Sequence, residues 1–293
     1  MDNKINDLFN GYRRGEVSRR DFLRKLTLCT GSVAAAATLL SFTNEHNAPP
    51  AEVNSIPGAE GKKDKSGVVT EFITYPGASG EMKAFLARPA KKKKYPAVIV
   101  VHEIFGLNQH IRDVVQRFAQ EGFLTIAPDA LSSLGGTPDD NSKAAAMIRE
   151  LDGEATTKNY VAAVKYLKTH PLSTGKVGCT GFCWGGAMTN QVAVNEPGLD
   201  AAVPYYGRTP ASEDVPKIKA PILAHFAGDD ARINEGIPAF EEALKKAGKE
   251  YRIFVYEGAK HAFNNDSNPE RYDAQAAKLA WERTIAFFKE KLK

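Results

Sequence analysis

The chain has 293 residues and a formal net charge of +4, with 43% hydrophobic and 25% charged residues. These values are typical of a soluble globular protein that is long enough to bury a core of its own. Residues 1–44 carry seven Lys/Arg against four Asp/Glu, so the rest of the chain is almost neutral and gives no reason to expect nucleic acid as a partner.

Residues 1–43 have the order of a targeting segment. Ser18–Leu23 (Ser-Arg-Arg-Asp-Phe-Leu) precedes an alanine-rich, mildly apolar stretch over residues 26–42. The pattern resembles a twin-arginine export signal, so we predict contact with the twin-arginine translocation machinery and a periplasmic or otherwise exported protein. An amphipathic helix with a chance arginine pair is the alternative. The apolar stretch is short and contains Thr, Ser and Gly, and we expect no stable membrane span after export.

Residues 44–66 are polar and rich in Asn, Pro, Gly and Lys, which predicts a disordered linker. Residues 67–293 then alternate between short strands and longer helices. The predicted strands are Val68–Thr74, Met82–Arg88, Pro96–Val101, Phe123–Ala127, Lys176–Thr180, Ala201–Tyr205, Pro221–Ala227 and Tyr251–Tyr256. The predicted helices are His110–Glu121, Asn141–Leu151, Glu154–Thr169, Trp184–Val194, Ile237–Ala247 and Asp273–Lys291.

This alternation predicts an α/β fold with a mostly parallel central sheet and helices on both faces. In such sheets, functional residues gather at the carboxyl ends of the strands. The motifs that carry chemistry are therefore sought where predicted strands end.

A candidate nucleophile follows the strand Lys176–Thr180. Gly181–Gly185 (Gly-Phe-Cys-Trp-Gly) fits the Gly-x-nucleophile-x-Gly turn between a strand and a helix, with Cys183 in place of serine. Side chains two residues before or after the nucleophile would collide in so tight a turn. The helix N-terminus should favour the thiolate, and the N–H of Trp184 should face a developing oxyanion. Cys179, inside the strand, is predicted to be a buried free thiol.

The acid and the histidine of this fold follow the nucleophile in chain order. The strand Pro221–Ala227 leads to Asp229 and Asp230, and the strand Tyr251–Tyr256 leads to His261. We predict that His261 is the general base and acid, oriented by one of the aspartates. Both aspartates remain open, although the Gly-x-Asp spacing favours Asp230. The other histidines lack ligand spacing, so we expect no metal site.

Glu103, Ile104 and Phe105 follow the strand Pro96–Val101. The loop at this position supplies a second oxyanion amide, which we assign to the N–H of Ile104. Glu103 lies at the same sheet edge as Cys183 and could accept the thiol proton or keep the thiol protonated at rest. The alternative for Glu103 is an exposed loop carboxylate. We expect Phe105 to contact substrate.

Four motifs together resemble the dienelactone hydrolase (carboxymethylenebutenolidase-like) family: His102–Gly106, Gly181–Gly186, Tyr205–Gly207 and Lys260–Phe263. The resemblance spans roughly residues 67–293. It implies a single-domain α/β-hydrolase that cleaves a small ester or lactone without a cofactor. It also implies a triad of Cys183, Asp230 and His261, with Glu103 as activating carboxylate and Tyr206 at the pocket wall.

The sequence departs from this family at an arginine. Family members that act on dienelactone bind its carboxylate with arginine, one of which lies four residues after the histidine. Here that position is Asn265, and residues 131–140 contain no arginine. We therefore expect a different, uncharged acyl group. Two other functions remain open: a thioesterase or other acyl hydrolase on the same triad, and an exported binding protein without catalysis.

Overall fold

The computed structural model describes the backbone of residues 54–55 and 62–63 and all of residues 67–293. The predicted signal segment, residues 1–43, lies outside the described residues, as does most of the predicted linker, residues 44–66. The described parts of that linker are two short strands, β1 (Asn54–Ser55) and β2 (Lys62–Lys63). Both pair antiparallel with β3 (Val68–Gly77).

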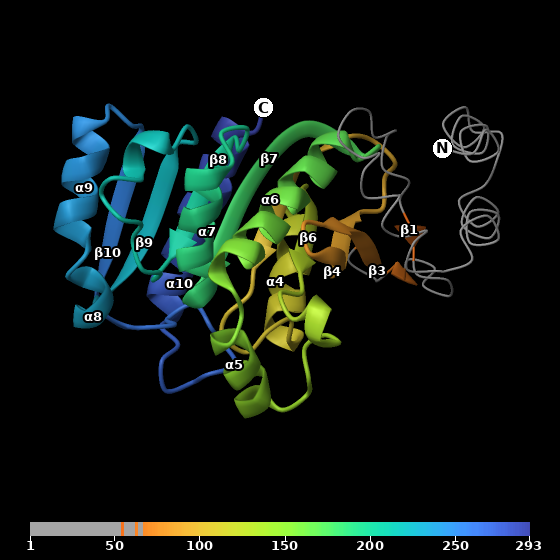
Figure 1. Cartoon of the computed structure of the whole chain (residues 1–293), viewed down its shortest axis with the longest axis horizontal. Helices are drawn as coiled ribbons and strands as arrows, with labels where there is room; N and C mark the ends of the chain where they lie inside the picture. The colour runs from red at the N-terminus through yellow and green to blue at the C-terminus, as the bar shows by residue number, and fades with distance from the viewer. Residues whose placement is uncertain (1–53, 56–61, 64–66) are drawn as a thin grey trace, which may run out of the picture. The chain divides into compact units, whose positions relative to one another are not determined.

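The described strands form one ten-stranded sheet in the order β1-β3-β4-β6-β5-β7-β8-β9-β10, with β2 beside β3 (Figure 1). All neighbours from β6 to β10 pair in parallel, whereas β3, β4 and β6 pair antiparallel. The prediction of a mostly parallel α/β sheet is therefore confirmed. The remaining strands are β4 (Gly80–Pro89), β5 (Tyr95–Val101), β6 (Leu124–Pro128), β7 (Ser173–Phe182), β8 (Ala201–Tyr205), β9 (Ile222–Asp229) and β10 (Tyr251–Lys260).

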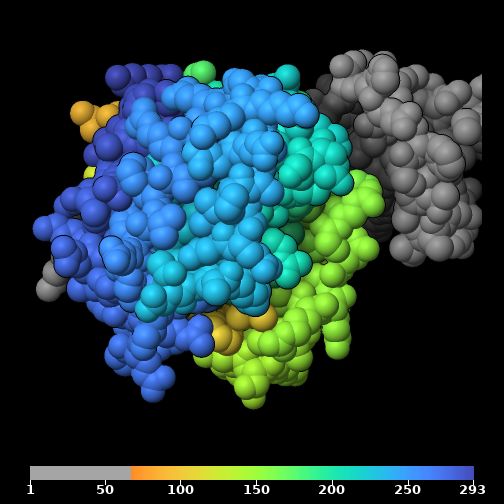
Figure 2. All heavy atoms as spheres, turned by 90° about the vertical axis from the view of Figure 1, so that its left-hand side faces the viewer, coloured from red at the N-terminus to blue at the C-terminus, as the bar shows by residue number. Residues whose placement is uncertain are grey.

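Helices pack on both faces of this sheet, over two separate hydrophobic clusters. Successive residues of β5 alternate between them: Ile99 and Val101 face one cluster and Val98 and Val100 the other, all of them fully buried. One cluster takes side chains from α6 (Gly153–Thr169), α7 (Trp184–Asn195) and α9 (Ile237–Lys246), and the other from α4 (Gln109–Gln120) and α10 (Ala274–Lys291). Figure 2, viewed from the β10 end, shows dark blue residues of α10 on one side and green and teal residues on the other.

The structure extends several predicted elements and adds short ones. β7 runs from Ser173 to Phe182 because its polar ends also pair with neighbouring strands, which the apolar run in the sequence does not reveal. β10 continues to Lys260 after a register shift beyond Tyr256. The predicted helix Asn141–Leu151 is slightly shorter in the structure, as α5 (Asn141–Arg149). The elements that were not predicted are α8 (Ala231–Asn234) and the 3-10 turns η1 (Ser132–Leu134) and η2 (Val215–Lys217).

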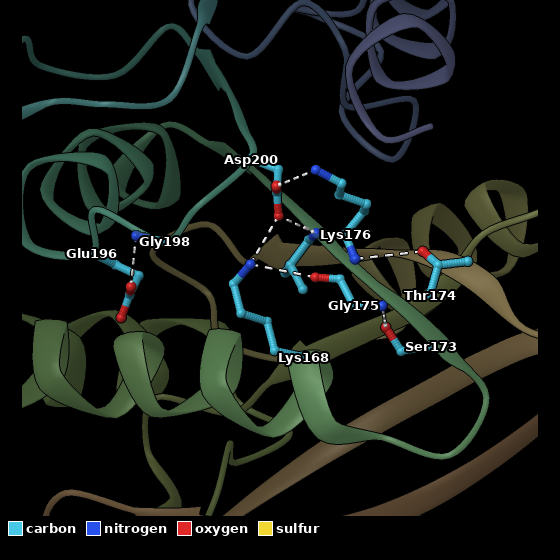
Figure 3. A network of polar contacts seen from close by, with 9 residues as sticks. Lys168, Ser173, Thr174, Gly175, Lys176, Glu196, Gly198 and Asp200 are labelled. Atoms are coloured by element: carbon cyan, nitrogen blue, oxygen red, sulfur yellow. Dashed lines mark hydrogen bonds and ion pairs between the residues drawn. The ribbon is translucent and has the colours of Figure 1, made fainter.

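A polar network around Asp200 holds the amino ends of β7 and β8 together (Figure 3). The carboxylate accepts from the N–H of Val177 at 2.9 Å, from Lys168 Nζ at 3.0 Å and from Lys176 Nζ at 3.2 Å. Burial acts to raise the pKa of Asp200, but these donors outweigh it and hold that pKa below its ordinary value. The network fixes the ends of the strands opposite to those that carry the motifs above.

No helix in the described part of the chain has the length and hydropathy needed to cross a bilayer.

Candidate active site

Cys183 lies in the turn between β7 and α7, with a φ of 56° and a ψ of −114°. A Cβ atom at Gly181 would lie 2.3 Å from the carbonyl oxygen of Gly185. A Cβ atom at Gly185 would lie 2.4 Å from the carbonyl oxygens of Val101 and His102, at the end of β5. The two glycines therefore have the steric role that the sequence predicts, and Gly185 also sets how closely α7 approaches β5.

Positive φ values mark the edge of the sheet where Cys183 lies. The described chain has three non-glycine residues in this region: Cys183 beyond β7, Tyr206 beyond β8 and Ala262 beyond β10. Backbone strain of this kind is retained where the surrounding structure enforces it, and such residues cluster at active sites. The three residues place a candidate site at the carboxyl ends of the parallel strands, as the fold predicts.

The histidine and its acid meet at the same edge. His261 Nδ1 is hydrogen-bonded to Oδ2 of Asp230, which directly follows β9 and is buried. Asp229 is exposed and lies opposite Lys260 in the β9–β10 ladder. Because successive side chains of an extended chain point in opposite directions, only one of the two aspartates can face His261. The structure brings Asp230 to the histidine and leaves Asp229 outside.

Glu103 is not an exposed loop residue, because only 3% of its surface is accessible. Its Oε2 accepts a hydrogen bond of 2.6 Å from Nδ2 of Asn265. Burial raises the pKa of the Glu103 carboxyl from 4.5 to about 7, against the lowering effects of Asn265 and Arg271. The carboxyl therefore changes its protonation state near neutral pH.

His102 holds the backbone of Glu103, a role that sequence reasoning did not predict. The N–H of Ala130 donates to His102 Nε2 at 3.1 Å, so the ring proton lies on Nδ1 and is donated to the Glu103 carbonyl oxygen at 2.7 Å. The ring is fully buried and stacks on Trp184 at a centroid distance of 5.3 Å. Burial also lowers the pKa of His102, which keeps this ring neutral.

The thiol of Cys183 is protonated at rest. Burial and the nearby Glu103 raise its pKa from 9.0 to about 11, and the N–H of Trp184 and the charge of Arg232 offset this only in part. The backbone amide at the helix N-terminus favours the thiolate, as the sequence predicts, but Glu103 acts in the opposite direction and helps to keep the thiol protonated at rest. Desolvation and a neighbouring carboxylate outweigh the backbone amide.

Cys183, His261 and Glu103 line one cavity of about 300 Å³, together with Ile104 and Phe105. A cavity of this size is suited to a small ligand. Within the described residues no acceptor is found for the backbone N–H of Ile104, and that of Trp184 is hydrogen-bonded to the Cys183 sulfur. The assignment of these two amides as donors to a developing oxyanion stays a prediction.

Tyr206 does not belong to the cavity wall, contrary to what the family resemblance implies. Its side chain is 1% exposed, and its ring lies edge-on to His261 at a centroid distance of 5.2 Å. Its N–H donates to the carbonyl of His225 at 2.7 Å. The residue packs behind the histidine, where it limits the positions that the imidazole can take.

Two arginines that sequence reasoning missed line the cavity: Arg232 in α8 and Arg271 before α10. Neither guanidinium forms an ion pair or a hydrogen bond with another described side chain. The expectation of an uncharged acyl group depended on the absence of arginine at position 265 and in residues 131–140. Cations nevertheless reach the cavity from other segments, which follow Asp230 and His261 in the sequence, and the charge of the acyl group stays a prediction.

No group of three or more His, Cys, Asp or Glu side chains in the described part of the chain is arranged to hold a metal ion.

Comparisons with known proteins point to one family. Residues 82–292 match the model described as "Dienelactone hydrolase family". The chain is 34% identical over 239 residues to a protein of Escherichia coli K12 provisionally named a carboxymethylenebutenolidase, covering 76% of this chain and 88% of that protein. It is 36% identical to the protein usf of Aquifex pyrophilus, covering 72% and 94%. A crystal structure from Klebsiella pneumoniae, provisionally named a dienelactone hydrolase, is similar at 30% identity and a TM-score of 0.69, covering 76% and 98%.

Proposed function

The chain belongs to the dienelactone hydrolase family, and we propose that it hydrolyses a small ester or lactone through a cysteine acyl-enzyme. One observation carries this proposal: Cys183, Glu103 and His261 line the same small cavity, and Asp230 is bonded to the histidine from behind. A nucleophile, a proton acceptor and an oriented histidine around one small cavity are the groups that acyl transfer requires.

Acylation begins with the resting thiol. As the Cys183 sulfur attacks the carbonyl carbon, its proton passes to the Glu103 carboxylate and the S–C bond forms. The N–H groups of Ile104 and Trp184 stabilise the oxyanion. The C–O bond to the leaving group then breaks, and the leaving oxygen takes the proton that Glu103 accepted from the thiol.

Deacylation restores the starting state. Neutral His261 removes a proton from water, and the resulting hydroxide attacks the thioester carbon. The carboxylic acid is released when the S–C bond breaks, and the thiolate takes the proton from the imidazolium of His261, whose charge Asp230 stabilises. Each turnover therefore consumes one water and returns the thiol, the carboxylate and the imidazole to their initial protonation states.

The first test compares Cys183, in the cavity wall, with the buried Cys179. Cys183→Ala should lower kcat for small activated esters by about 10³-fold or more, because it removes the nucleophile. Cys179→Ala should keep most of the activity, since Cys179 is fully buried within β7 and its thiol is hydrogen-bonded to Thr189. Mass spectrometry of quenched wild-type enzyme should find the acyl group on Cys183. Wild-type turnover in Cys183→Ala would contradict the mechanism.

The second test separates the alternatives by leaving group and charge. A matched series of ester, thioester and amide substrates with the same acyl group identifies the reaction, and a clear preference for thioesters would favour a thioesterase. Alkylation of Cys183 by iodoacetamide without turnover of any substrate would favour a binding protein. Neutral and carboxylate-bearing lactones, tested in parallel, show whether Arg232 and Arg271 attract an anionic substrate.

A further inference from the structure

The loop after His261 reaches back to Glu103 through a single side chain. Asn265 donates from Nδ2 to Glu103 Oε2 at 2.6 Å, and its Oδ1 accepts from both the N–H and the hydroxyl of Ser267, at 3.0 and 2.6 Å. The N–H of Asn265 donates to the carbonyl of Ala262 at 2.9 Å. Glu103 and Asn265 are both buried, so these bonds form away from bulk water.

Ser267 fixes which way the Asn265 amide points. A backbone N–H can only donate, so the atom that faces the N–H of Ser267 must be the amide oxygen. The amide nitrogen is then directed at Glu103, which as a carboxylate can only accept. Rotation of the amide by a half turn would break both bonds to Ser267 and place two acceptors against each other at Glu103.

We propose that Asn265, oriented by Ser267, is a positioning residue that holds Glu103 beside Cys183 and keeps it able to exchange the thiol proton near neutral pH. The inference rests on the proposed function, in which Glu103 accepts that proton. It concerns residues outside the triad and explains why a neutral amide, and not a cation, occupies position 265.

The pKa of Glu103 is set by groups on several segments of the chain. Burial raises its pKa to about 7, while the Asn265 hydrogen bond and the charge of Arg271 act in the opposite direction. The other titratable groups around it are Cys183 and Tyr206, whose pKa values its charge raises, together with His261, Arg232 and the neutral His102. A cation at position 265 would make Glu103 a weaker proton acceptor, and an acceptor at that position would keep it protonated.

The main test is Asn265→Asp, which preserves the shape and the bonds from Ser267 but replaces the donor with a carboxylate. Two adjacent carboxylates share a proton, so the acid limb of the kcat/KM profile should move up by about one pH unit or more. Activity at pH 7 should fall about 5-fold and recover at alkaline pH, with KM little changed. A raised KM at every pH with an unmoved acid limb would show that Asn265 binds substrate instead, and would overturn the proposal.

Ser267→Ala tests whether the Ser267 hydroxyl helps to orient the Asn265 amide, and it leaves Asn265 itself unchanged. Ser267 is exposed, so the variant should fold normally. It loses the hydroxyl bond to Asn265 Oδ1 but keeps the backbone N–H bond, so the amide is held less firmly and the acid limb should shift in the same direction by less. Ser267→Thr restores the hydroxyl and should restore the profile. Glu270→Gln, at an exposed position of the same loop outside the cavity wall, should behave like wild type.

The outcomes distinguish this proposal from the function on which it rests. Absence of turnover in the wild-type enzyme, or turnover in Cys183→Ala, would refute the acyl-enzyme function itself. Turnover that depends on Cys183, with an unmoved acid limb in Asn265→Asp, would refute only the role of Asn265. If Asn265→Asp does not fold, an unmoved acid limb in Ser267→Ala decides against the proposal in the same way.

Discussion

At the scale of single residues, the chemistry depends on the relative pKa values of one thiol, Cys183, and one carboxyl, Glu103. Burial raises the pKa of both groups, to about 11 for Cys183 and to about 7 for Glu103. The resting state above pH 7 is therefore a neutral thiol beside a carboxylate. A protonated resting thiol resists oxidation and alkylation better than a thiolate, because the thiolate is the nucleophilic form. Proton transfer during attack then produces the nucleophile only when a carbonyl is in place.

Glu103→Gln should separate activity from stability. The folded pKa of Glu103 lies above its unfolded value of 4.5, so its destabilising effect is absent below pH 4.5 and complete above about pH 7. The shift corresponds to at most roughly 3 kcal/mol in the free energy of unfolding. Glutamine keeps the acceptor for Asn265 but has no charge to bury.

We expect Glu103→Gln to be more stable than wild type in urea unfolding at pH 8, to lose this advantage at pH 4.5, and to lose most esterase activity at both. Equal stability of the two proteins at pH 8 would show that the carboxyl is not charged in its buried position. Retained activity at pH 8 would show that Glu103 does not accept the thiol proton.

At the scale of elements, the site depends on how closely α7 approaches the end of β5. The first turn of α7 contacts β5 through Gly185, whose missing side chain leaves room for the carbonyl groups of Val101 and His102. His102 and Glu103 continue directly from β5, so the same approach brings Glu103 toward Cys183. Strand, turn and helix thus set the distance between proton donor and acceptor.

Gly185→Ala should therefore damage stability and activity together. Its Cβ would lie 2.4 Å from two backbone oxygens that cannot rotate away, so α7 must move from β5. Overpacking of this kind lowers the free energy of unfolding by about 1–3 kcal/mol or more. Gly153→Ala, in the first turn of α6 with no atom within 4 Å of the new Cβ, is the matched control and should be neutral or slightly stabilising. Thermal unfolding and kcat/KM of both variants check the prediction, and equal Tm values would contradict it.

At the scale of the whole molecule, the candidate site is assembled from loops that follow β5, β7, β8, β9 and β10. The polar network around Asp200 fixes β7 and β8 at their opposite ends, far from the cavity along the strands. This separation lets a rigid sheet hold the reacting groups while the loops vary. It also allows Arg232 in α8 and Arg271 before α10 to reach the same cavity from different segments.

We propose that the N-terminal segment exports the folded enzyme, since the twin-arginine pattern over residues 18–23 fits that route. Replacing Arg19 and Arg20 together by lysine keeps the charge but removes the arginine pair. In a bacterium with an intact twin-arginine machinery, this variant of the full chain should accumulate in the cytoplasm, whereas the wild-type chain appears in the exported fraction. Cell fractionation and immunoblotting measure the distribution of the two chains. Equal export of both would favour the alternative, an amphipathic helix with a chance arginine pair.

Sequence alone determined the features that depend on neighbouring residues. The alternation of apolar runs and helical spacing predicts the sheet and its helices, because the repeat of each backbone geometry sets which neighbouring residues share a buried face. The glycine spacing around Cys183 predicts the strained turn, and the position of His261 after a strand predicts its place at the sheet edge. These predictions needed no knowledge of what lies across the fold.

Only the tertiary structure decided the features that depend on contacts across the chain. Asp230 and not Asp229 faces His261, and Asn265 binds Glu103 from 162 residues away. Burial cannot be read from the sequence of these segments. It raises the pKa of the Cys183 thiol, which stays protonated, and brings the pKa of Glu103 near neutrality. Desolvation and hydrogen bonding act through space, so the segments that surround a group, and not its neighbours in sequence, set its chemistry.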